Sequence, residues 1–271
     1  MDRFRKLFNK RCSVIGMVHL QALPGCPLFS GSVNKIVEKA CEETELYLKH
    51  DIDGILVENM HDIPYIQSKY FGPEVTSTMT RICTEIRKLI PETKPFGVQV
   101  LACGNREALA IAKACSMNFV RAEGFVFSHV ADEGFTDANA GLILRYRKQI
   151  QAEDVLVFTD IKKKHSSHAI TNDISLLETA KAAEYFLSNG LILTGTATGH
   201  AADVQELKEL KSNIDLPVLI GSGVTIDNVE KYISADALIV GSYFKKHGKW
   251  DNDIDEERLS RFMKKIKNCS H

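Results

Sequence analysis

The strongest constraint on the fold of this chain is a regular alternation of short apolar runs and longer amphipathic segments. The apolar runs are rich in Val, Ile and Leu, as strands buried on both faces are. They occupy residues 13–19, 54–59, 96–101, 119–124, 155–161, 191–196, 217–223 and 237–243. The segments between them carry apolar residues at helical spacing. Eight alternations predict one (β/α)8 TIM barrel, an α/β fold, because a doubly wound sheet would leave one or two runs unused.

The length of 271 residues suits a single barrel, which takes about 250 residues. We expect one domain over 1–271, with an N-terminal helix over 1–12, the barrel over 13–250 and a C-terminal helix over 251–271. The basic first stretch has Phe4, Leu7 and Phe8 at helical spacing. It predicts a helix that closes the bottom of the barrel or, alternatively, the start of a mitochondrial targeting segment. The expected location is the cytoplasm, with the mitochondrion as the alternative.

The overall charge and the cysteines narrow the class of ligand. The net charge is -1, which gives no footprint for nucleic acid or a membrane surface, and no run approaches the roughly 18 apolar residues of a membrane span. Seven cysteines without a C-x-x-C pair indicate reduced thiols rather than disulfides or a zinc site. A small-molecule ligand is therefore expected, and a homo-oligomer is the usual state of such proteins.

The predicted strand ends divide into a charged half and a glycine half. Barrel active sites lie at the C-terminal ends of the strands. The second, fourth and fifth strands end in charged or amide side chains, namely Glu58, Asn59, Glu123, Asp160 and Lys162. The sixth to eighth strands end in small or hydroxylated residues, namely Thr194, Thr196, Gly221, Ser222, Gly223, Gly241 and Ser242.

The glycine half predicts a phosphate cradle. Glycine lets the backbone approach a ligand closely, and barrel phosphate sites frequently use the loops after the seventh and eighth strands. A helix capped by Thr225 is expected after the first of these turns. The alternative is that the glycines only make tight turns.

The fifth strand and its loop, "VLVFTDIKKKHSSH" over 155–168, carry the densest chemistry. Because side chains alternate along a strand, Asp160 and Lys162 are expected to face the barrel mouth. A lysine beside a carboxylate can polarise a carbonyl, hold a phosphate or form a Schiff base. The carboxylate can act as a general base or bind a metal. The alternative for Asp160 is a structural ion pair with Arg121 or Lys162.

Four further candidates surround this motif. Lys164 and His165 are expected to line the site, whereas Lys163 is expected to be solvated. Glu58 ends a buried strand, where a charge is costly unless it is paired or functional. Together with Asp160 and a histidine it can bind a divalent metal, although the spacing matches no known ligand motif. His19, at the end of the first strand, is either a site residue or a structural histidine. The long stretch 122–141 is expected to form a lid or a wall of the site.

Several of these stretches resemble the BtpA family. They are "VIGMVHLQALPGCPLFSG" at 14–31, "DGILVENMHDIPY" at 53–65, "TDIKKKHSSH" at 159–168, "LTGTATG" at 193–199, "PVLIGSGVTIDNV" at 217–229 and "ALIVGSYFKKHGKWDNDID" at 237–255. The resemblance implies a ribulose-phosphate-binding barrel. The fifth-strand motif of the family resembles Asp-x-Asx-x-Lys-His, which implies roles for Asp160, Lys164 and His165. Lys162 stands where an acidic or amide residue is often found, a departure that argues against a metal or second-acid role there.

These observations favour an enzyme that acts on a phosphorylated sugar or a nucleotide-like small molecule. The likeliest chemistry is proton transfer of the isomerase, epimerase or lyase type. Glu58, Asp160 and Lys164 would move the proton, with His19 and His165 assisting. One alternative is a hydrolase of a glycosidic or phosphate bond that uses Glu58 and Asp160 as paired carboxylates. Another is a non-catalytic assembly or stability factor, the role for which members of the BtpA family were named in photosystem I accumulation.

Overall fold

The computed structural model describes residues 2–195 and 199–269, and eight parallel strands form its centre. They are β1 (Ser13–His19), β2 (Gly54–Glu58), β3 (Phe96–Gln99), β4 (Phe119–Ala122), β7 (Leu156–Asp160), β9 (Gly190–Leu193), β10 (Val218–Ile220) and β11 (Ala237–Val240). The strands close in the order β1-β11-β10-β9-β7-β4-β3-β2. The predicted TIM barrel is confirmed.

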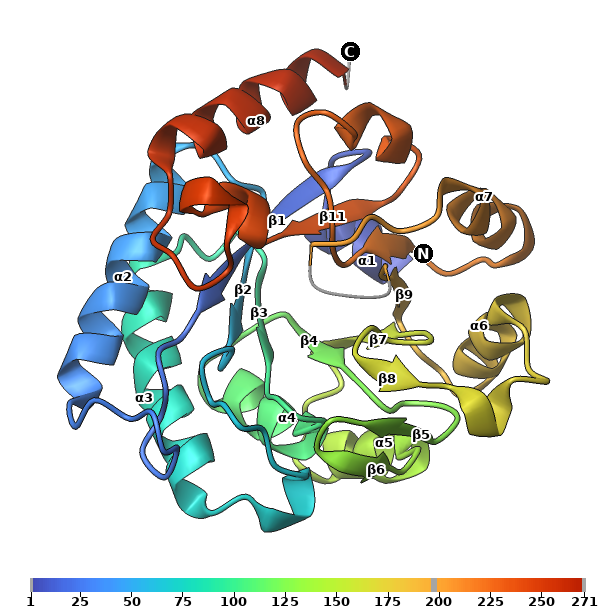
Figure 1. Cartoon of the computed structure of the whole chain (residues 1–271), viewed down its shortest axis with the longest axis horizontal. Coiled ribbons are helices and arrows are strands. Elements are labelled where there is room, and N and C mark those ends of the chain that lie inside the picture. The colour runs from blue at the N-terminus through green and yellow to red at the C-terminus, as the bar shows by residue number, and fades with distance from the viewer. Residues whose placement is uncertain (1, 196–198, 270–271) are drawn as a thin grey trace.

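A ring of helices surrounds the strands (Figure 1). It comprises α2 (Val33–Lys49), α3 (Pro73–Leu89), α4 (Asn105–Ala114), α5 (Ala140–Gln149), α6 (Leu176–Tyr185), α7 (Val204–Asn213) and α8 (Glu256–Cys269). Short 3₁₀ helices lie in the loops: η1 (Ser68–Tyr70), η2 (Ala169–Thr171), η3 (Val229–Tyr232), η4 (Ser242–Phe244) and η5 (Lys246–Gly248). In the described ranges, none of the helices is both long and apolar enough to cross a bilayer.

The cap predicted at Thr225 is present, but the segment after it forms only the 3₁₀ helix η3 and not an α-helix. Thr225 Oγ1 accepts from the Asp227 N–H at 3.3 Å, and Asn228 Oδ1 accepts from the Thr225 N–H at 2.8 Å. This reciprocal pattern is that of a capping box. Asn228 Nδ2 also donates to the Gly223 carbonyl at 2.8 Å and so ties the segment to the glycine turn.

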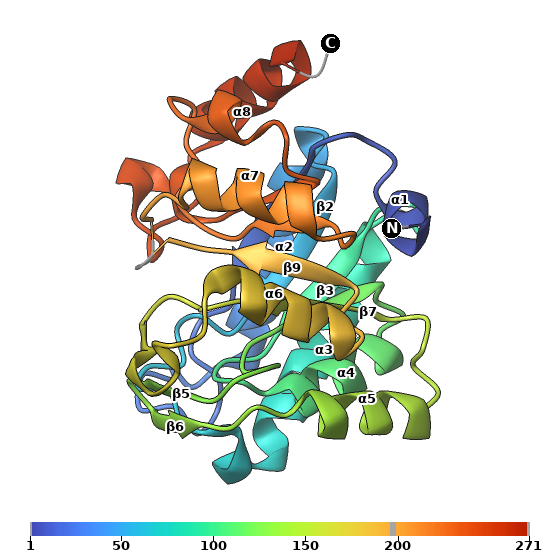
Figure 2. The same cartoon turned by 90° about the vertical axis from the view of Figure 1, so that its right-hand side faces the viewer.

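The floor of the barrel is an aromatic cluster. Phe4 on α1 (Asp2–Leu7) and Phe8 stack at 4.8 Å, and both rings contact Phe158. Phe8 and Phe158 also contact Phe119. Figure 2 shows α1 at the end of the barrel opposite β5 and β6. The first helix therefore closes the bottom, as the first of the two sequence interpretations expects.

A small antiparallel sheet stands at the other end. Strands β5 (His129–Ala131) and β6 (Gly134–Thr136) form a hairpin, and β8 (Ser166–Ser167) pairs with β5. The sheet joins the loop after β4 to the loop after β7. The long stretch after β4 is thus an ordered hairpin at the barrel mouth, and Asp132 and Glu133 at its turn line a cavity there.

Candidate functional site at the mouth of the barrel

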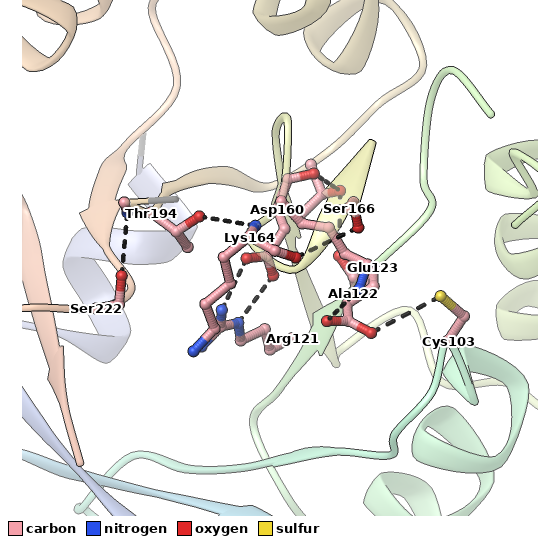
Figure 3. A network of polar contacts seen from close by, with 12 residues as sticks. Cys103, Arg121, Ala122, Glu123, Asp160, Lys164, Ser166, Thr194 and Ser222 are labelled. Carbon is pink, nitrogen blue, oxygen red and sulfur yellow. Dashed lines mark hydrogen bonds and ion pairs between the residues drawn. The ribbon is translucent and has the colours of Figure 1, made fainter. Parts of the chain in front are cut away.

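The centre of the mouth is an ion pair between Arg121 of β4 and Asp160 of β7 (Figure 3). The Arg121 Nε donates to Asp160 Oδ2 at 2.8 Å, and its Nη2 donates to Oδ1 at 2.7 Å. The two side chains are 4% and 1% exposed. Burial alone would lower the pKa of Arg121, but the Asp160 carboxylate raises it above the ordinary value. Each oxygen of Asp160 accepts one of these hydrogen bonds, so this carboxylate orients Arg121, as the structural alternative expects.

The three lysines after β7 diverge where the strand ends. Lys162 adopts a φ of 45°, which breaks the alternation of the strand. Its Nζ donates to the Thr171 carbonyl at 3.4 Å. Lys162 and Asp160 line the same small cavity, which is not the one lined by His19 and Glu58. Lys163 is 8% exposed, and its Nζ lies 3.6 Å from Glu123 Oε1. Our expectation of a solvated Lys163 is wrong, because the turn at Lys162 directs the next side chain inward.

Lys163 and Glu123 form a second buried pair beside the first. Burial would raise the pKa of Glu123, but Lys163 and Arg121 lower it below the usual value. Burial would lower the pKa of Lys163, but the Glu123 carboxylate raises it above the usual value. Cys103 also donates from Sγ to Glu123 Oε2 at 3.7 Å. Glu123 is thus held ionised on the side of the mouth that faces the hairpin.

Glu58 and His19 stand next to one another because β1 and β2 pair in register at these two residues. Glu58 Oε2 lies 3.8 Å from His19 Nε2. Burial raises the pKa of Glu58, and Arg121 and Lys164 partly oppose this. Burial and the Lys245 cation lower the pKa of His19 to about 3. His19 Nδ1 lies 3.1 Å from the Trp250 carbonyl, which can only accept, so Nδ1 carries the proton and Nε2 is an acceptor.

The first cavity connects this cluster to the glycine half. It holds about 670 Å³ of empty space, which includes open solvent at its mouth. His19, Glu58, Arg121 and Lys164 line one side, and the loops after β10 and β11 line the other with Gly221, Ser222, Gly223, Gly241 and Ser242. Arg258 of α8 also lines it, where its Nε donates to the Tyr243 carbonyl at 2.7 Å. Burial and Arg121 lower the pKa of Lys164.

A second cavity adjoins the first through Glu58, Met60, Arg121 and Lys164, which line both. It encloses about 860 Å³, again with open solvent. Glu123, Lys163 and His165 contribute charged or polar side chains, and burial lowers the pKa of His165. Thus Glu58 and Lys164 lie where two cavities meet, and His165 belongs to the second one.

Three predicted binding residues form hydrogen bonds within the protein. The Asn59 side chain donates to the Leu101 carbonyl and to Asp62, and accepts from the Leu101 N–H, so it ties two loops together. Thr194 Oγ1 accepts from the Lys164 N–H at 3.2 Å. Ser222 Oγ donates to the His200 carbonyl at 3.2 Å and accepts from the Gly195 N–H at 3.1 Å. Thr196 lies outside the described residues.

The donor set does not suit the divalent metal that we considered. Over residues 2–195 and 199–269, no three His, Cys, Asp or Glu side chains are placed to hold a metal ion. Glu58 and His19 approach one another, but Asp160 accepts from two nitrogens of Arg121, Nε and Nη2.

Sequence reasoning missed three residues that line the cavities. Arg258 comes from the last helix, which no strand-end rule covers. Gln99 is the last residue of β3, pairs in register with Glu58 and is 2% exposed. Trp250 lies in the loop before α8 and lines the second cavity. A strand-end signal pointed toward Gln99, but nothing in the local sequence marked the other two.

Comparisons with known proteins agree with this architecture. Thiamine phosphate pyrophosphorylase from Pyrococcus furiosus superposes with a TM-score of 0.60 at 14% identity, over 97% of this chain and 98% of that one. KGPDC from Streptococcus mutans gives a TM-score of 0.61 at 9% identity, over 97% and 100%. At such low identity these similarities concern the fold, which is that of TIM-barrel enzymes.

Relatives in sequence are much more similar. An uncharacterised mitochondrial protein of Caenorhabditis elegans is 46% identical over 265 residues, covering 96% of this chain and 95% of its own. The photosystem I biogenesis protein BtpA of Synechocystis is 34% identical over 266 residues, covering 97% and 90%. The BtpA family model matches residues 10–268. The chain therefore belongs to the BtpA family.

Proposed function

We propose that the protein is an enzyme that moves a proton on a phosphorylated sugar or nucleotide-like small molecule, next to a carbonyl group. One observation carries the proposal. Glu58, His19 and Lys164, whose pKa values are all displaced by burial, line the same cavity as the glycine loops after β10 and β11. Displaced pKa values in a cavity are typical of acid–base sites.

The phosphate group is assigned to the glycine half. Gly221, Gly223 and Gly241 present backbone without side chains at this wall, and Arg258 supplies a cation there. A Cβ on Gly223 would lie 2.1 Å from the His200 carbonyl oxygen, so only glycine fits that turn. These two loops are the ones that frequently bind phosphate in such barrels.

The proton transfer is assigned to Glu58. A carboxyl group with a raised pKa is a better general base when ionised, and it can return the proton near neutral pH. Neutral His19 offers Nε2 as an acceptor that orients a hydroxyl group of the substrate. Lys164 and Arg121 supply positive charge for an oxyanion that develops in the transition state. Asp160 acts as a positioning residue for Arg121, and His165 contacts the part of the substrate in the second cavity.

The names of structural neighbours support this substrate class. They include phosphoribosyl anthranilate isomerase from Thermus thermophilus and KGPDC from Streptococcus mutans in complex with D-R5P. Both are barrels whose names or ligands include a phosphate-bearing sugar. The same fold makes such a substrate a reasonable choice for this chain, although a fold hosts many activities.

The test has two stages. Sugar phosphates, nucleotides and inorganic phosphate are first screened for a rise in melting temperature, since a ligand of the folded state stabilises it by mass action. Each hit is then incubated with the enzyme in D₂O and followed by proton NMR. We expect a C–H signal next to a carbonyl to disappear. Glu58→Gln should retain the thermal shift and lose the exchange.

The alternatives give different results in the same experiment. A hydrolase would release a fragment without C–H exchange, but its proposed partner Asp160 is already occupied by Arg121. A non-catalytic factor, like the Synechocystis relative named for photosystem I biogenesis, would show neither exchange nor product. A binding hit with neither outcome would therefore reject the enzyme. We also propose that the protein is a homo-oligomer. It is located in the cytoplasm or, alternatively, in the mitochondrion.

A further inference from the structure

The two cavities share Glu58, Arg121 and Lys164 but differ in their other charged residues. Beyond Glu58, Arg121 and Lys164, the first cavity adds the cation Arg258. The second adds the Glu123–Lys163 pair, whose charges offset one another, and the two hairpin acids, Asp132 and Glu133. The first cavity thus attracts an anion, while the second repels a further anionic group.

Gln99 lines the second cavity with a buried polar side chain. It is 2% exposed and lines this cavity beside Glu58. Its Oε1 is buried and has no hydrogen-bond partner among the described residues. A buried amide atom without a partner is costly, and its persistence calls for an explanation such as a ligand. Because an amide offers a donor and an acceptor side by side, it matches a group that offers the complementary pair.

The remaining walls are apolar and partly aromatic. Met60, Ile63, Tyr65, Leu101 and Trp250 line the cavity. Tyr65 is held in place because its hydroxyl donates to the Met60 carbonyl at 2.6 Å. Apolar and aromatic walls with a few polar groups are typical of sites for flat organic rings. A bare sugar phosphate has no such ring and would leave these walls and Gln99 unused.

We propose that the second cavity binds an uncharged, N–H-bearing heterocyclic ring attached to the phosphorylated sugar. This inference rests on the proposed function, and it narrows the substrate class to nucleotide-like molecules. The phosphate lies toward Arg258 and the glycine loops. The sugar lies between His19, Glu58 and Lys164, where the two cavities meet. The edge of the ring forms hydrogen bonds with the Gln99 amide.

The chain contains a single tryptophan, Trp250, and it lines the second cavity. Its fluorescence therefore reports directly on a ring that enters. The probes are inorganic phosphate, ribose 5-phosphate and the four common nucleoside 5′-monophosphates. We expect at least one nucleotide to change the emission and to bind at least about tenfold more tightly than ribose 5-phosphate, the scale of one paired amide contact.

The matched variant is Gln99→Leu, which is similar in size and lacks the polar atoms. Because it removes an unpartnered buried group, it should melt at the same temperature as the wild type or higher. Its affinity for the nucleotide should fall to that for ribose 5-phosphate, with phosphate binding unchanged. If the affinity advantage survives in Gln99→Leu, the assignment of Gln99 is overturned.

The remaining outcomes separate this inference from the proposed function. If ribose 5-phosphate binds as tightly as every nucleotide, the heterocycle is rejected and the phosphate site stands. If none of the phosphate-bearing probes binds, the phosphate site and this inference both fail.

Discussion

The two halves of the barrel mouth are held in shape by different forces. Around β2, β4 and β7, buried charges fix one another, as in the pairs Arg121–Asp160 and Lys163–Glu123. Around β10 and β11, shape depends on glycines that no other residue can replace, such as Gly223 with φ +71°. Substitutions in the charged half should therefore act on folding and its pH dependence. Those in the glycine half should act mainly on ligand binding.

The largest effect should come from Arg121→Met. This change leaves Asp160, whose side chain is 1% exposed, without its partner. Removing one member of a buried pair typically costs about 3–5 kcal/mol. We expect the free energy of unfolding, measured by urea denaturation, to fall by that amount.

Two controls sharpen this prediction. Lys148→Met removes a surface pair with Glu153, where the lysine side chain is 79% exposed, and should change little. The double variant Arg121→Met/Asp160→Leu removes both charges and should recover most of the loss. An Arg121→Met protein as stable as Lys148→Met would show that the charged half does not depend on this pair.

In the glycine half, Gly223→Ala should weaken phosphate-dependent stabilisation. The added Cβ would meet the backbone of His200 and Ala201 within 2.1 to 2.4 Å, so the loop has to move. Gly31→Ala is the control, since Gly31 also has a positive φ, +83°, but its Cβ would meet nothing within 4 Å. Both changes should cost about 1–2 kcal/mol from the backbone conformation alone.

The measurement is the thermal shift that inorganic phosphate or a sugar phosphate produces in each variant. We expect Gly31→Ala to keep the wild-type shift and Gly223→Ala to lose at least about tenfold in affinity, roughly 1.4 kcal/mol. Equal shifts in the two variants would place the phosphate elsewhere.

The pH dependence of stability should show two opposite contributions from neighbouring residues. His19 stays neutral in the folded protein down to about pH 3, whereas an unfolded histidine takes up a proton near about pH 6.5. Between these values the unfolded chain binds the extra proton, so stability falls as the pH falls. His19→Gln should therefore reduce the slope of the free energy of unfolding against pH, by up to about 1.4 kcal/mol per pH unit.

Glu58 contributes to the pH dependence of stability with the opposite sign. Its pKa is raised in the folded protein, so the folded chain binds the extra proton, and stability falls as the pH rises through that pKa. Glu58→Gln should make the slope steeper and should stabilise the protein most at neutral pH. The check is urea denaturation from about pH 4 to 8. Slopes that change with the same sign in both variants would contradict the assignment of these environments.

The fold was predictable because the eight strands are apolar runs, most of them rich in Val, Ile and Leu. Few folds other than a barrel use eight such runs that alternate with helices. The positions of candidate site residues were predictable only where a strand end fixes a direction, as for Glu58, His19 and Asp160. Prediction failed where the backbone leaves the strand, because Lys162 turns at φ 45° and thereby buries Lys163. It also failed for Arg258, which reaches the cavity by the packing of a distant helix. The ion pair between Arg121 and Asp160 could be given only as an alternative to a functional role of Asp160, because pairing depends on how side chains from different strands meet.

The smallest effect should come from the hairpin that borders the second cavity. Asp132 is exposed and Glu133 is half-buried, so the double variant Asp132→Asn/Glu133→Gln should leave the stability nearly unchanged. It should alter selectivity, because the hairpin acids repel an anionic ring. Uridine and orotidine 5′-monophosphates differ only by a carboxylate on the ring. In the wild type the carboxylated nucleotide should bind several-fold more weakly, on the order of the 1 kcal/mol that a partly screened charge contributes. In the double variant this gap should narrow, and it should narrow in the wild type at high salt as well. A gap that persists in the variant would mean that shape, rather than the charge of the hairpin, selects the ring.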